Sequence, residues 1–419
     1  MPSVNVIVEC PTRESFRVEQ VRGMFGLPAA ARSRQQFSVE LPGIDEPWQI
    51  GAIVGPSGSG KTTIARAAFA GCLARPPRWP RDRAVIDCFG SRPIKEVTCA
   101  LTAVGFSSPP AWLRPYHTLS TGERFRCDLA RALLVARCRG AAAPQSSFSL
   151  RERNATFAER KATIVCDEFT SVVDRTVAKM ASAAVSKAIR SGKINRRLVA
   201  VTCHDDVLAW LEPDWVLDMG TGQLTRGRLR RPPIRLRLFR CRREAWLLFA
   251  RHHYLSADLP CGVTCVMGLI DGRPAAFAAW LPMFGRRGVW RIARLVVLPD
   301  YQGVGIGAAL LRACGELISA VNRRATITTS HPAMIAHLRA SPDWLIRGVK
   351  PAGGNRSGIP SARYRSSAGR AVVSAEFVQS SPRCSVTGES GAMDNASQLH
   401  SGALLEKNGG QVHRQRSVV

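Results

Sequence analysis

Residues 55–62, GPSGSGKT, have the composition and spacing of a phosphate-binding loop. They fit the pattern G-x-x-x-x-G-K-[ST], follow the apolar run WQIGAIVG, and precede the helical run TTIARAAFAGCLA. In such a loop the glycines let backbone N–H groups wrap a β-phosphate, the lysine neutralises the β- and γ-phosphate oxygens, and the final hydroxyl ligates Mg²⁺. The sequence therefore predicts a triphosphate site made by Gly55, Ser57, Gly58, Gly60, Lys61, Thr62 and Thr63.

Three further polar residues end apolar runs downstream of this loop. TIVCDE, 163–168, ends in Asp167 and Glu168, and LVAVTCH, 198–204, ends in His204. An acid after such a strand can hold Mg²⁺ beside Thr62, and the next can orient or deprotonate an attacking water. A histidine near a γ-phosphate could position or sense it. The set predicts metal-assisted triphosphate hydrolysis, with Thr62 and Asp167 as metal ligands.

A second glycine-rich turn lies in RIARLVVLPDYQGVGIGAALLRAC, residues 291–314. Gly303-x-Gly305-x-x-Ala308 formally fits a dinucleotide-binding pattern, but that site also needs an acid about 20 residues later. The corresponding region, NRRATITTSH, has none. The turn also lacks a lysine and a metal-binding acid, so it suits gripping a pyrophosphate rather than cleaving one.

The elements that must position these groups fall into two regions. Up to about residue 225, apolar strands alternate with helical runs such as TVAKMASAAVSKAIR, which predicts a parallel sheet flanked by helices. Pro232-Pro233 marks a boundary, and the strand that follows alternates Ile234, Leu236 and Leu238 with Arg235 and Arg237. A polar insertion at 139–162 interrupts the first region. Turn-forming residues without periodicity predict disorder from 381 to 419.

Composition limits the class of protein. The 419 residues are 45% hydrophobic, enough for real cores, and carry a formal net charge of +28. Such a charge suits a polyanionic partner such as nucleic acid, although a genome that favours arginine would produce it too. No apolar run is long enough to span a bilayer, and the 13 cysteines are scattered as reduced thiols of a cytoplasmic protein would be. We therefore expect a cytoplasmic protein of two domains with no membrane association.

The first region resembles the ABC ATPases. Leu119-Ser120-Thr121-Gly122-Glu123 is similar to the signature motif of that family, with Thr and Glu in place of Gly and Gln, and SVVD at 171–174 is similar to its D-loop. The resemblance implies that Ser120 and Gly122 contact the ATP γ-phosphate held by a partner subunit, so that the chain forms a homodimer. It further implies that Glu168 is the catalytic carboxylate and His204 the switch histidine.

Two features depart from the ABC pattern. No glutamine occurs between Ile64 and Ser120, so the Q-loop glutamine is missing or replaced. The interval between Lys61 and Leu119 is short, so the helical subdomain must be reduced. Soluble ABC proteins that act on nucleic acid are therefore a nearer comparison than transporter subunits.

The second region resembles the GNAT N-acetyltransferases. Gln302-x-x-Gly305-x-Gly307, with the preceding strand and following helix, is similar to the acetyl-CoA loop of that family. The resemblance implies that backbone amides of the loop hold the CoA pyrophosphate, which assigns cofactor binding to Gln302, Gly303, Val304, Gly305 and Gly307. The fold class is thus α/β, an ABC-type P-loop NTPase domain at 1–228 followed by a mixed α/β GNAT-like acyltransferase domain at 229–380.

Acyl transfer needs a deprotonated amine, a polarised carbonyl and a proton donor for the thiolate. RHHYLSAD offers His252, His253, Tyr254 and Asp258, and TSHPA offers Ser330 and His331. We select His253 and Tyr254 as catalytic candidates, although each cluster equally suits a structural role. The helix after residue 330 has no tyrosine at the place where many GNAT enzymes carry their acid.

Three functions agree with these features. The first is an ATP-hydrolysing ABC-type ATPase fused to an acetyl-CoA-dependent N-acyltransferase that acts on nucleic acid, with ATP, Mg²⁺ and acetyl-CoA as cofactors. The second is a protein or small-amine acetyltransferase regulated by ATP. The third is a DNA-binding ABC ATPase whose GNAT fold is not catalytic.

Overall fold

The computed structural model describes residues 3–11, 13–27, 32–43, 45–135, 162–254, 257–350, 371–378, 403–408 and 411–416. The chain divides into two compact units. Residues 1–78 and 127–231 make the first, and residues 79–126 and 232–419 make the second. The predicted insertion at 139–162 lies outside the described residues apart from its last position.

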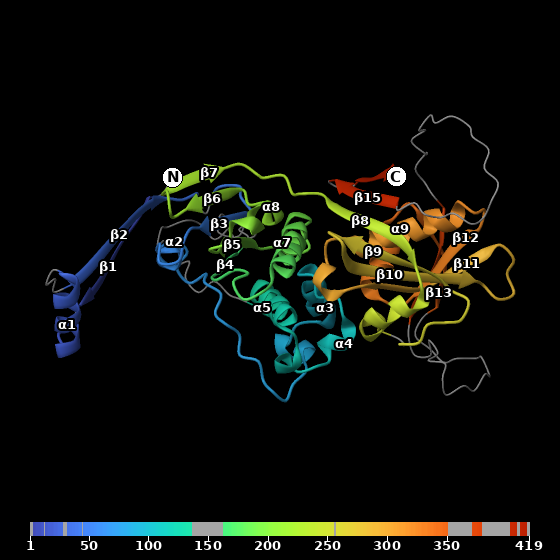
Figure 1. Cartoon of the computed structure of the whole chain (residues 1–419), viewed down its shortest axis with the longest axis horizontal. Coiled ribbons are helices and arrows are strands. Elements are labelled where there is room, and N and C mark those ends of the chain that lie inside the picture. The colour runs from blue at the N-terminus through green and yellow to red at the C-terminus, as the bar shows by residue number, and fades with distance from the viewer. Residues whose placement is uncertain are drawn as a thin grey trace, which may run out of the picture. The chain divides into compact units, whose positions relative to one another are not determined.

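The described part of the first unit contains a five-stranded sheet in the order β4-β5-β3-β6-β7. Its strands are β3 (Ile50–Val54), β4 (Thr163–Cys166), β5 (Arg197–Val201), β6 (Trp215–Asp218) and β7 (Gln223–Arg226). The first four in the order run parallel, and β7 pairs antiparallel with β6. The same unit contains α2 (Lys61–Ala68), α7 (Arg175–Arg190) and α8 (Leu208–Leu211). The predicted parallel sheet with flanking helices is confirmed (Figure 1).

Burial of β3 explains why its sequence is uniformly apolar. All five residues of β3 are buried, as expected for a central strand of a parallel sheet that is covered on both faces. Gly51 lets the indole of Trp215 approach the strand, because an added Cβ would lie 2.0 Å from a ring atom. Trp215 in turn contacts Trp48 edge-on at 5.5 Å between ring centroids.

Substitution of Gly51 by alanine is therefore expected to destabilise the first unit. The new methyl group would displace the fully buried Trp215 from a packed site, and overpacking of this kind costs about 1–3 kcal/mol. Thermal unfolding followed by tryptophan fluorescence would measure the loss. Gly58→Ala is the control without a steric clash, since no atom lies within 4 Å of its added Cβ. Its φ is +81°, so any loss of stability in this variant comes from backbone strain and not from overpacking.

An antiparallel hairpin precedes this sheet. It pairs β1 (Ser3–Pro11) with β2 (Arg32–Glu40) and carries α1 (Phe16–Phe25) between the two strands. Ser15 caps α1, its hydroxyl accepting the Val18 N–H at 3.3 Å. At the other end of the hairpin, Phe37 of β2 packs on Gly60, where it would lie 2.5 Å from an added Cβ. The hairpin thus reaches the phosphate loop.

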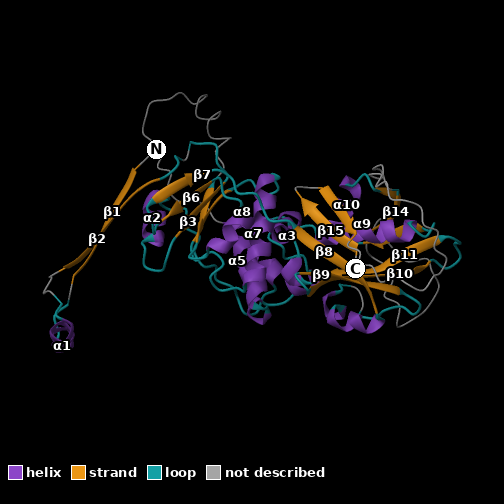
Figure 2. Ribbon diagram, turned by 45° about the horizontal axis from the view of Figure 1, so that its top comes forward, coloured by secondary structure: helices purple, strands orange, loops and turns teal. Residues whose placement is uncertain are grey.

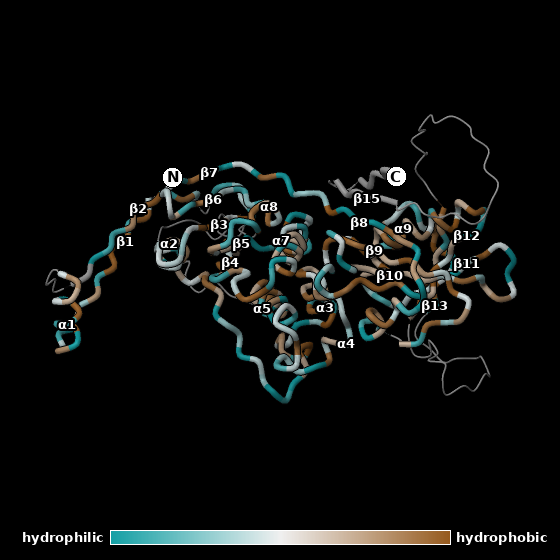
Figure 3. The backbone as a smooth tube through the Cα atoms, viewed as in Figure 1, coloured by the Kyte–Doolittle hydropathy of each residue, from teal (hydrophilic) through white to brown (hydrophobic). Residues whose placement is uncertain are grey.

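The described part of the second unit contains a nine-stranded sheet in the order β13-β14-β12-β11-β10-β9-β8-β15-β16. The bounds are β8 (Ile234–Cys241), β9 (Thr264–Ile270), β10 (Arg273–Pro282), β11 (Val289–Val297), β12 (Arg324–Thr329), β13 (Trp344–Lys350), β14 (Val372–Phe377), β15 (Ala403–Asn408) and β16 (Gln411–Arg416). Strand β10, in the middle of this sheet, consists largely of buried hydrophobic residues (Figure 3). On β8, Ile234, Leu236 and Leu238 are buried and Arg235 and Arg237 are exposed, which confirms the predicted alternation.

Helix α9 (Ile306–Ser319) follows β11 and packs on β10, β11 and β12, and α10 (Pro332–Ala340) packs on β13 (Figure 2). The strand–turn–helix predicted for residues 291–314 is therefore confirmed. The parallel ladder between β11 and β12 runs from the Val289–Arg324 pair to the Ile292–Ile327 pair, although both strands continue beyond it. A register shift opposite Ala279 and Trp280 leaves Ala293 of β11 as a bulge.

Residues 79–126 add a small helical segment to this unit. It contains η1 (Val85–Phe89), α3 (Ile94–Ala103), α4 (Pro109–Trp112), η2 (Tyr116–Thr118) and the start of α5 (Thr121–Val135). Trp79 stacks on Tyr116 at 4.7 Å, and the Trp112 indole N–H donates to the Phe106 carbonyl at 3.0 Å. Gly105, at φ 84°, ends α3 and turns the chain into a short connection of residues 104–108.

Two expectations concern the rest of the chain. Within the tail at 381–419, the structure describes two strands, β15 and β16, which pair with each other, and β15 also pairs with β8. The disorder predicted for the other residues of the tail concerns positions outside the described part. Cys88, Cys166 and Cys314 are buried, Cys203 is exposed, and none of the four forms a disulfide.

Candidate functional sites

The phosphate loop has the backbone that its glycines were expected to provide. Gly55, Gly58 and Gly60 have φ values of 138°, 81° and 83°, in the region that side-chain-bearing residues rarely adopt. Helix α2 begins directly after Gly60, with no side-chain cap on its first N–H groups. A helix start of this kind favours anions through its backbone donors and its dipole.

The lysine and the threonine of the loop are both anchored. Lys61 Nζ donates to the carbonyl oxygens of Gly55 at 2.9 Å and Pro56 at 2.6 Å, so its ammonium group lies over the loop. Thr62 Oγ1 donates to Asp167 Oδ1 at 3.0 Å. The two residues proposed from the sequence as metal ligands therefore lie in direct contact.

Sheet topology explains this contact. Strands β4, β5 and β3 are adjacent and parallel, so their carboxyl ends lie at one edge of the sheet. Asp167 and Glu168 follow β4, His204 follows β5, and the phosphate loop follows β3. Ligand sites of open α/β sheets form at this edge.

Glu168 occupies an unusual backbone conformation. Its φ is 52°, and the nearby Thr170, which is β-branched and fully buried, has a φ of 67°. The Glu168 side chain is exposed, and its Oε2 accepts a hydrogen bond from Ser171 Oγ at 2.7 Å. Left-handed conformations of such residues cost free energy and are concentrated at functional sites. The backbone thus fixes the direction of the predicted catalytic carboxylate.

The sequence interpretation did not find Phe37. Its ring packs on Gly60 at the start of α2, although it precedes that glycine by more than twenty residues. A lone phenylalanine in an alternating strand carries no signal of such a contact.

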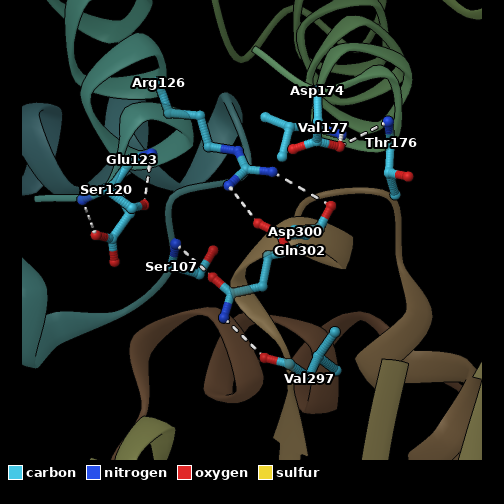
Figure 4. Close-up of polar contacts among 10 residues, drawn as sticks. All are labelled: Ser107, Ser120, Glu123, Arg126, Asp174, Thr176, Val177, Val297, Asp300 and Gln302. Atoms are coloured by element: carbon cyan, nitrogen blue, oxygen red, sulfur yellow. Dashed lines mark hydrogen bonds and ion pairs between the residues drawn. The ribbon is translucent and has the colours of Figure 1, made fainter. Parts of the chain in front are cut away.

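The residues of the proposed signature motif form a capping box at the start of α5. Glu123 Oε2 accepts the Ser120 N–H at 2.9 Å, and Ser120 Oγ accepts the Glu123 N–H at 3.3 Å (Figure 4). The glutamate that departs from the ABC pattern therefore has a structural use here. In the D-loop segment, Asp174 caps α7 by accepting the N–H groups of Thr176 and Val177.

The second glycine-rich turn leads into α9. Gly303 and Gly305 have φ values of 88° and 97°, and Gly305 begins the helix without a side-chain cap. Val304 is buried beneath the turn. This backbone is suited to bind an anion through main-chain donors.

The side chain of Gln302 is engaged within the protein. Its Nε2 donates to the Val297 carbonyl at 2.9 Å, and its Oε1 accepts the Ser107 N–H at 2.8 Å (Figure 4). Gln302 therefore fixes the shape of the turn, and the backbone groups that follow it are the candidate phosphate ligands.

The two groups of candidate catalytic residues, which are far apart in the sequence, meet in the structure. The Tyr254 hydroxyl lies 3.2 Å from Ser330 Oγ, and its ring meets the His331 ring edge-on at 5.6 Å between centroids. His253 packs between Tyr254 and Trp246, at 5.4 Å and 5.7 Å between centroids. Ser330 and His331 directly follow β12, so this cluster lies at the carboxyl end of that strand.

Burial affects the histidines of this region. Desolvation lowers the pKa of His331, although a hydrogen bond to the Ser107 carbonyl, 3.2 Å from Nε2, opposes the effect. Desolvation, assisted by Arg251, also lowers the pKa of His252. Both imidazoles are therefore neutral at pH 7, and His331 carries its proton on Nε2.

These shifts predict how stability depends on pH. A histidine whose pKa is depressed in the folded state takes up a proton more readily when unfolded, so stability falls as pH drops below the usual pKa of 6.5. The His331→Gln variant is expected to lose stability less steeply between pH 7 and pH 5 than the wild type. Thermal unfolding midpoints across this range would measure the slope, and equal slopes would contradict the prediction.

Several arginines between residues 226 and 240 are exposed. Arg230, Arg237 and Arg240 belong to this group, and so do Arg226 and Arg228, which pair with Glu46 and Glu212. No helix in the described ranges is long and apolar enough to cross a membrane.

The described ranges also contain no group of three His, Cys, Asp or Glu residues able to hold a metal. A Mg²⁺ ion at Thr62 and Asp167 would therefore need further oxygen ligands from nucleotide and water.

Comparison with known proteins identifies part of the chain. Residues 233–336 match the model of the acetyltransferase (GNAT) family. No curated protein matches the sequence.

Solved structures similar to this chain include an IAA acetyltransferase from Bacillus cereus and the ribosomal-protein-S18-alanine N-acetyltransferase from Escherichia coli. The first is 17% identical, with 34% of this chain and 98% of that chain covered and a TM-score of 0.27. The second is 14% identical, with 34% of this chain and 92% of that chain covered and a TM-score of 0.27. The dimeric bacterial ABC transporter cassette MJ0796 is 16% identical, with 43% of this chain and 86% of that chain covered and a TM-score of 0.30. Residues 233–336 are therefore similar to the acetyltransferase (GNAT) family, and the first unit contains a parallel α/β sheet whose strand β3 leads into the phosphate loop.

Proposed function

We propose that this protein hydrolyses ATP and transfers an acyl group from acyl-CoA to an amine of nucleic acid. The single observation that carries the transferase half is the meeting of Tyr254, Ser330 and His331 at the end of β12, in the domain that bears the acyl-CoA loop. The contact between Thr62 and Asp167 supports the ATPase half.

For ATP hydrolysis, the phosphate loop binds the β- and γ-phosphates and Lys61 neutralises their oxygens. Thr62 and Asp167 would hold Mg²⁺, which supplies neutralisation of the charge that develops on the phosphates. Glu168 accepts a proton from the attacking water, and Ser171 holds its carboxylate in place. Ser120 and Gly122 would complete the site of a second copy, so the active form is a homodimer.

For acyl transfer, the turn at 302–307 binds the pyrophosphate and so places the thioester. The amine nitrogen of the acceptor attacks the thioester carbonyl, a C–N bond forms, the C–S bond breaks, and the thiolate leaves. Tyr254 donates a proton to that thiolate, and the acceptor nitrogen loses one to a neutral base, for which His253 is the nearest candidate to the tyrosine. Ser330 orients the phenol through its hydrogen bond.

The charge of the protein supports a polyanionic acceptor. The net charge is +28, and Arg237 and Arg240 are exposed on β8. Arginines that neutralise phosphates make binding fall steeply with salt. A protein or a small amine is the second candidate acceptor, because the reaction itself needs only an amine.

One experiment separates the candidate acceptors. The full chain would be incubated with acetyl-CoA, ATP and Mg²⁺ together with duplex DNA, RNA, a lysine peptide or spermidine, and each product would be examined by mass spectrometry. An acetyl mass shift on DNA or RNA, absent with Tyr254→Phe, is expected. A shift confined to the peptide or spermidine would replace nucleic acid by the second candidate. ATPase stimulation by DNA or RNA without any mass shift would instead indicate a non-catalytic GNAT fold.

A further inference from the structure

The connection between α3 and α4, residues 104–108, contacts both halves of the proposed acyltransferase site. The Ser107 N–H donates to Gln302 Oε1 at 2.8 Å, and the Ser107 carbonyl oxygen lies 3.2 Å from His331 Nε2. Gln302 begins the turn after β11, and His331 lies just beyond the end of β12. One residue of the helical segment thus bridges the carboxyl ends of two neighbouring strands.

This bridge lies on the path that the pantetheine of a bound acyl-CoA would occupy. If the turn at 302–307 binds the pyrophosphate and Tyr254 acts at the thioester, the pantetheine must extend from the first of these groups to the second. The ladder between β11 and β12 ends at Ile292 and Ile327, so no backbone pairing joins the strands beyond that point. Ser107 is hydrogen-bonded at both ends of this path.

The bonds that hold the bridge are of a kind that a ligand can replace. Both join uncharged groups, and such hydrogen bonds contribute little net stability because water or ligand atoms can take the place of either partner. The connection is short and contains Gly105, whose φ of 84° is the left-handed conformation that ends a helix.

A second contact ties the same turn to the signature helix. Arg126 of α5 is fully buried, its Nη2 donates to the Asp300 carbonyl at 3.2 Å, and its Nη1 lies 4.0 Å from Asp300 Oδ1 (Figure 4). Asp300 lies in η6 (Pro299–Tyr301), which immediately precedes Gln302. The helix that begins with the Ser120–Glu123 capping box is therefore fastened to the acyl-CoA turn.

We propose that residues 104–108 close the acyl-CoA site in the nucleotide-free protein, and that the signature helix controls this closure through Arg126 and Asp300. ATP at the signature motif shifts α5, the bridge from Ser107 to Gln302 and His331 opens, and acyl-CoA binds. The inference rests on the proposed functions of both sites. Because coupling between two ligands is reciprocal, acyl-CoA also raises the affinity for ATP by the same factor.

Calorimetric titration of the full chain with acetyl-CoA tests the coupling. A non-hydrolysable ATP analogue with Mg²⁺ is expected to tighten acetyl-CoA binding about tenfold, within the usual range of allosteric coupling. Arg126→Met keeps a long apolar side chain but removes the donors to Asp300, so it should bind acetyl-CoA tightly with or without the analogue. Arg131→Met is the matched control, because Arg131 lies on the same helix and donates to the Arg78 carbonyl at 2.8 Å. This control should keep the wild-type response.

Hydrogen exchange on the wild type tests the closure without any substitution. Saturating acetyl-CoA is expected to speed exchange of the Ser107 amide, because its bond to Gln302 must open. Unchanged protection of residues 104–108 while acetyl-CoA is bound would overturn the proposed closure, and equal acetyl-CoA affinity with and without the analogue would overturn its control by ATP. Failure to bind acetyl-CoA under any condition is a different result, since it would remove the proposed acyltransferase and the inference together.

Discussion

Glu168→Gln is expected to reduce the rate of ATP hydrolysis by about 10²–10⁴-fold, the usual contribution of a positioned general base. Glutamine has nearly the same shape and can still accept the hydrogen bond that Ser171 donates at 2.7 Å, but it cannot take a proton from water. The phosphate loop, Lys61 and the contact between Thr62 and Asp167 are untouched, so ATP affinity should be retained. Phosphate release at saturating ATP would give the rate, and fluorescent-nucleotide titration would give the affinity.

Glu212→Gln provides a closely matched control. Glu212 also has a φ of 52°, but its carboxylate pairs with Arg228 at 3.0 Å, and it lies in the turn that follows α8. Glu212→Gln therefore removes a negative charge from a glutamate with the same strained backbone, and the rate of ATP hydrolysis should stay unchanged in this variant. Wild-type phosphate release by Glu168→Gln, or an equal loss in both variants, would remove Glu168 from the proposed role.

The phosphate site shows which features a sequence can predict well. The order of strand, glycine loop and helix is local, and parallel strands bring their carboxyl ends to one edge, so the proximity of Asp167 to Thr62 follows from the sequence pattern alone. The strained φ values of Glu168 and Thr170 could not be expected, because neither residue type signals a left-handed backbone. They depend on the packing that buries Thr170 completely.

The proposed acyl-CoA site shows the opposite case. The turn at 302–307 and its helix were predictable from local sequence, whereas the meeting of Tyr254 with Ser330 joins segments that no motif connects. The grouping of residues 79–126 with the second unit was not foreseen either. It depends on single side-chain contacts such as those of Arg126 and Gln302, for which helical periodicity gives no signal.

The capping box shows how a departure from a family pattern can have a local cause. Residues 119–123 resemble the ABC signature motif, and Glu123 stands where that motif has glutamine. In the structure the Glu123 carboxylate accepts the Ser120 N–H, and a negative charge in the first turn also suits the helix dipole. Either residue type can form the box, so the substitution preserves the start of the helix.

Tyr254→Phe is expected to lower acyl transfer by about 10²–10⁴-fold while leaving acetyl-CoA affinity unchanged. The phenyl ring keeps its edge-on contact with His331 and its packing on His253, so the cluster should retain its shape. Only the hydroxyl that lies 3.2 Å from Ser330 Oγ is lost, and with it the proposed proton donor to the departing thiolate. Release of free thiol would be measured with duplex DNA, RNA and spermidine, using whichever acceptor the wild type turns over.

Two further variants distinguish proton donation from a loss of local structure. Tyr116→Phe removes a hydroxyl from a tyrosine that is stacked on Trp79, away from the proposed chemistry, and should leave transfer unchanged. Ser330→Ala keeps the phenol but removes its partner, so it should lower the rate less than Tyr254→Phe does, because a mispositioned acid still donates. If Tyr254→Phe transfers acyl groups at the wild-type rate, the proton must come from another group, and the neutral His331, which carries its Nε2 proton toward the Ser107 carbonyl, becomes the candidate.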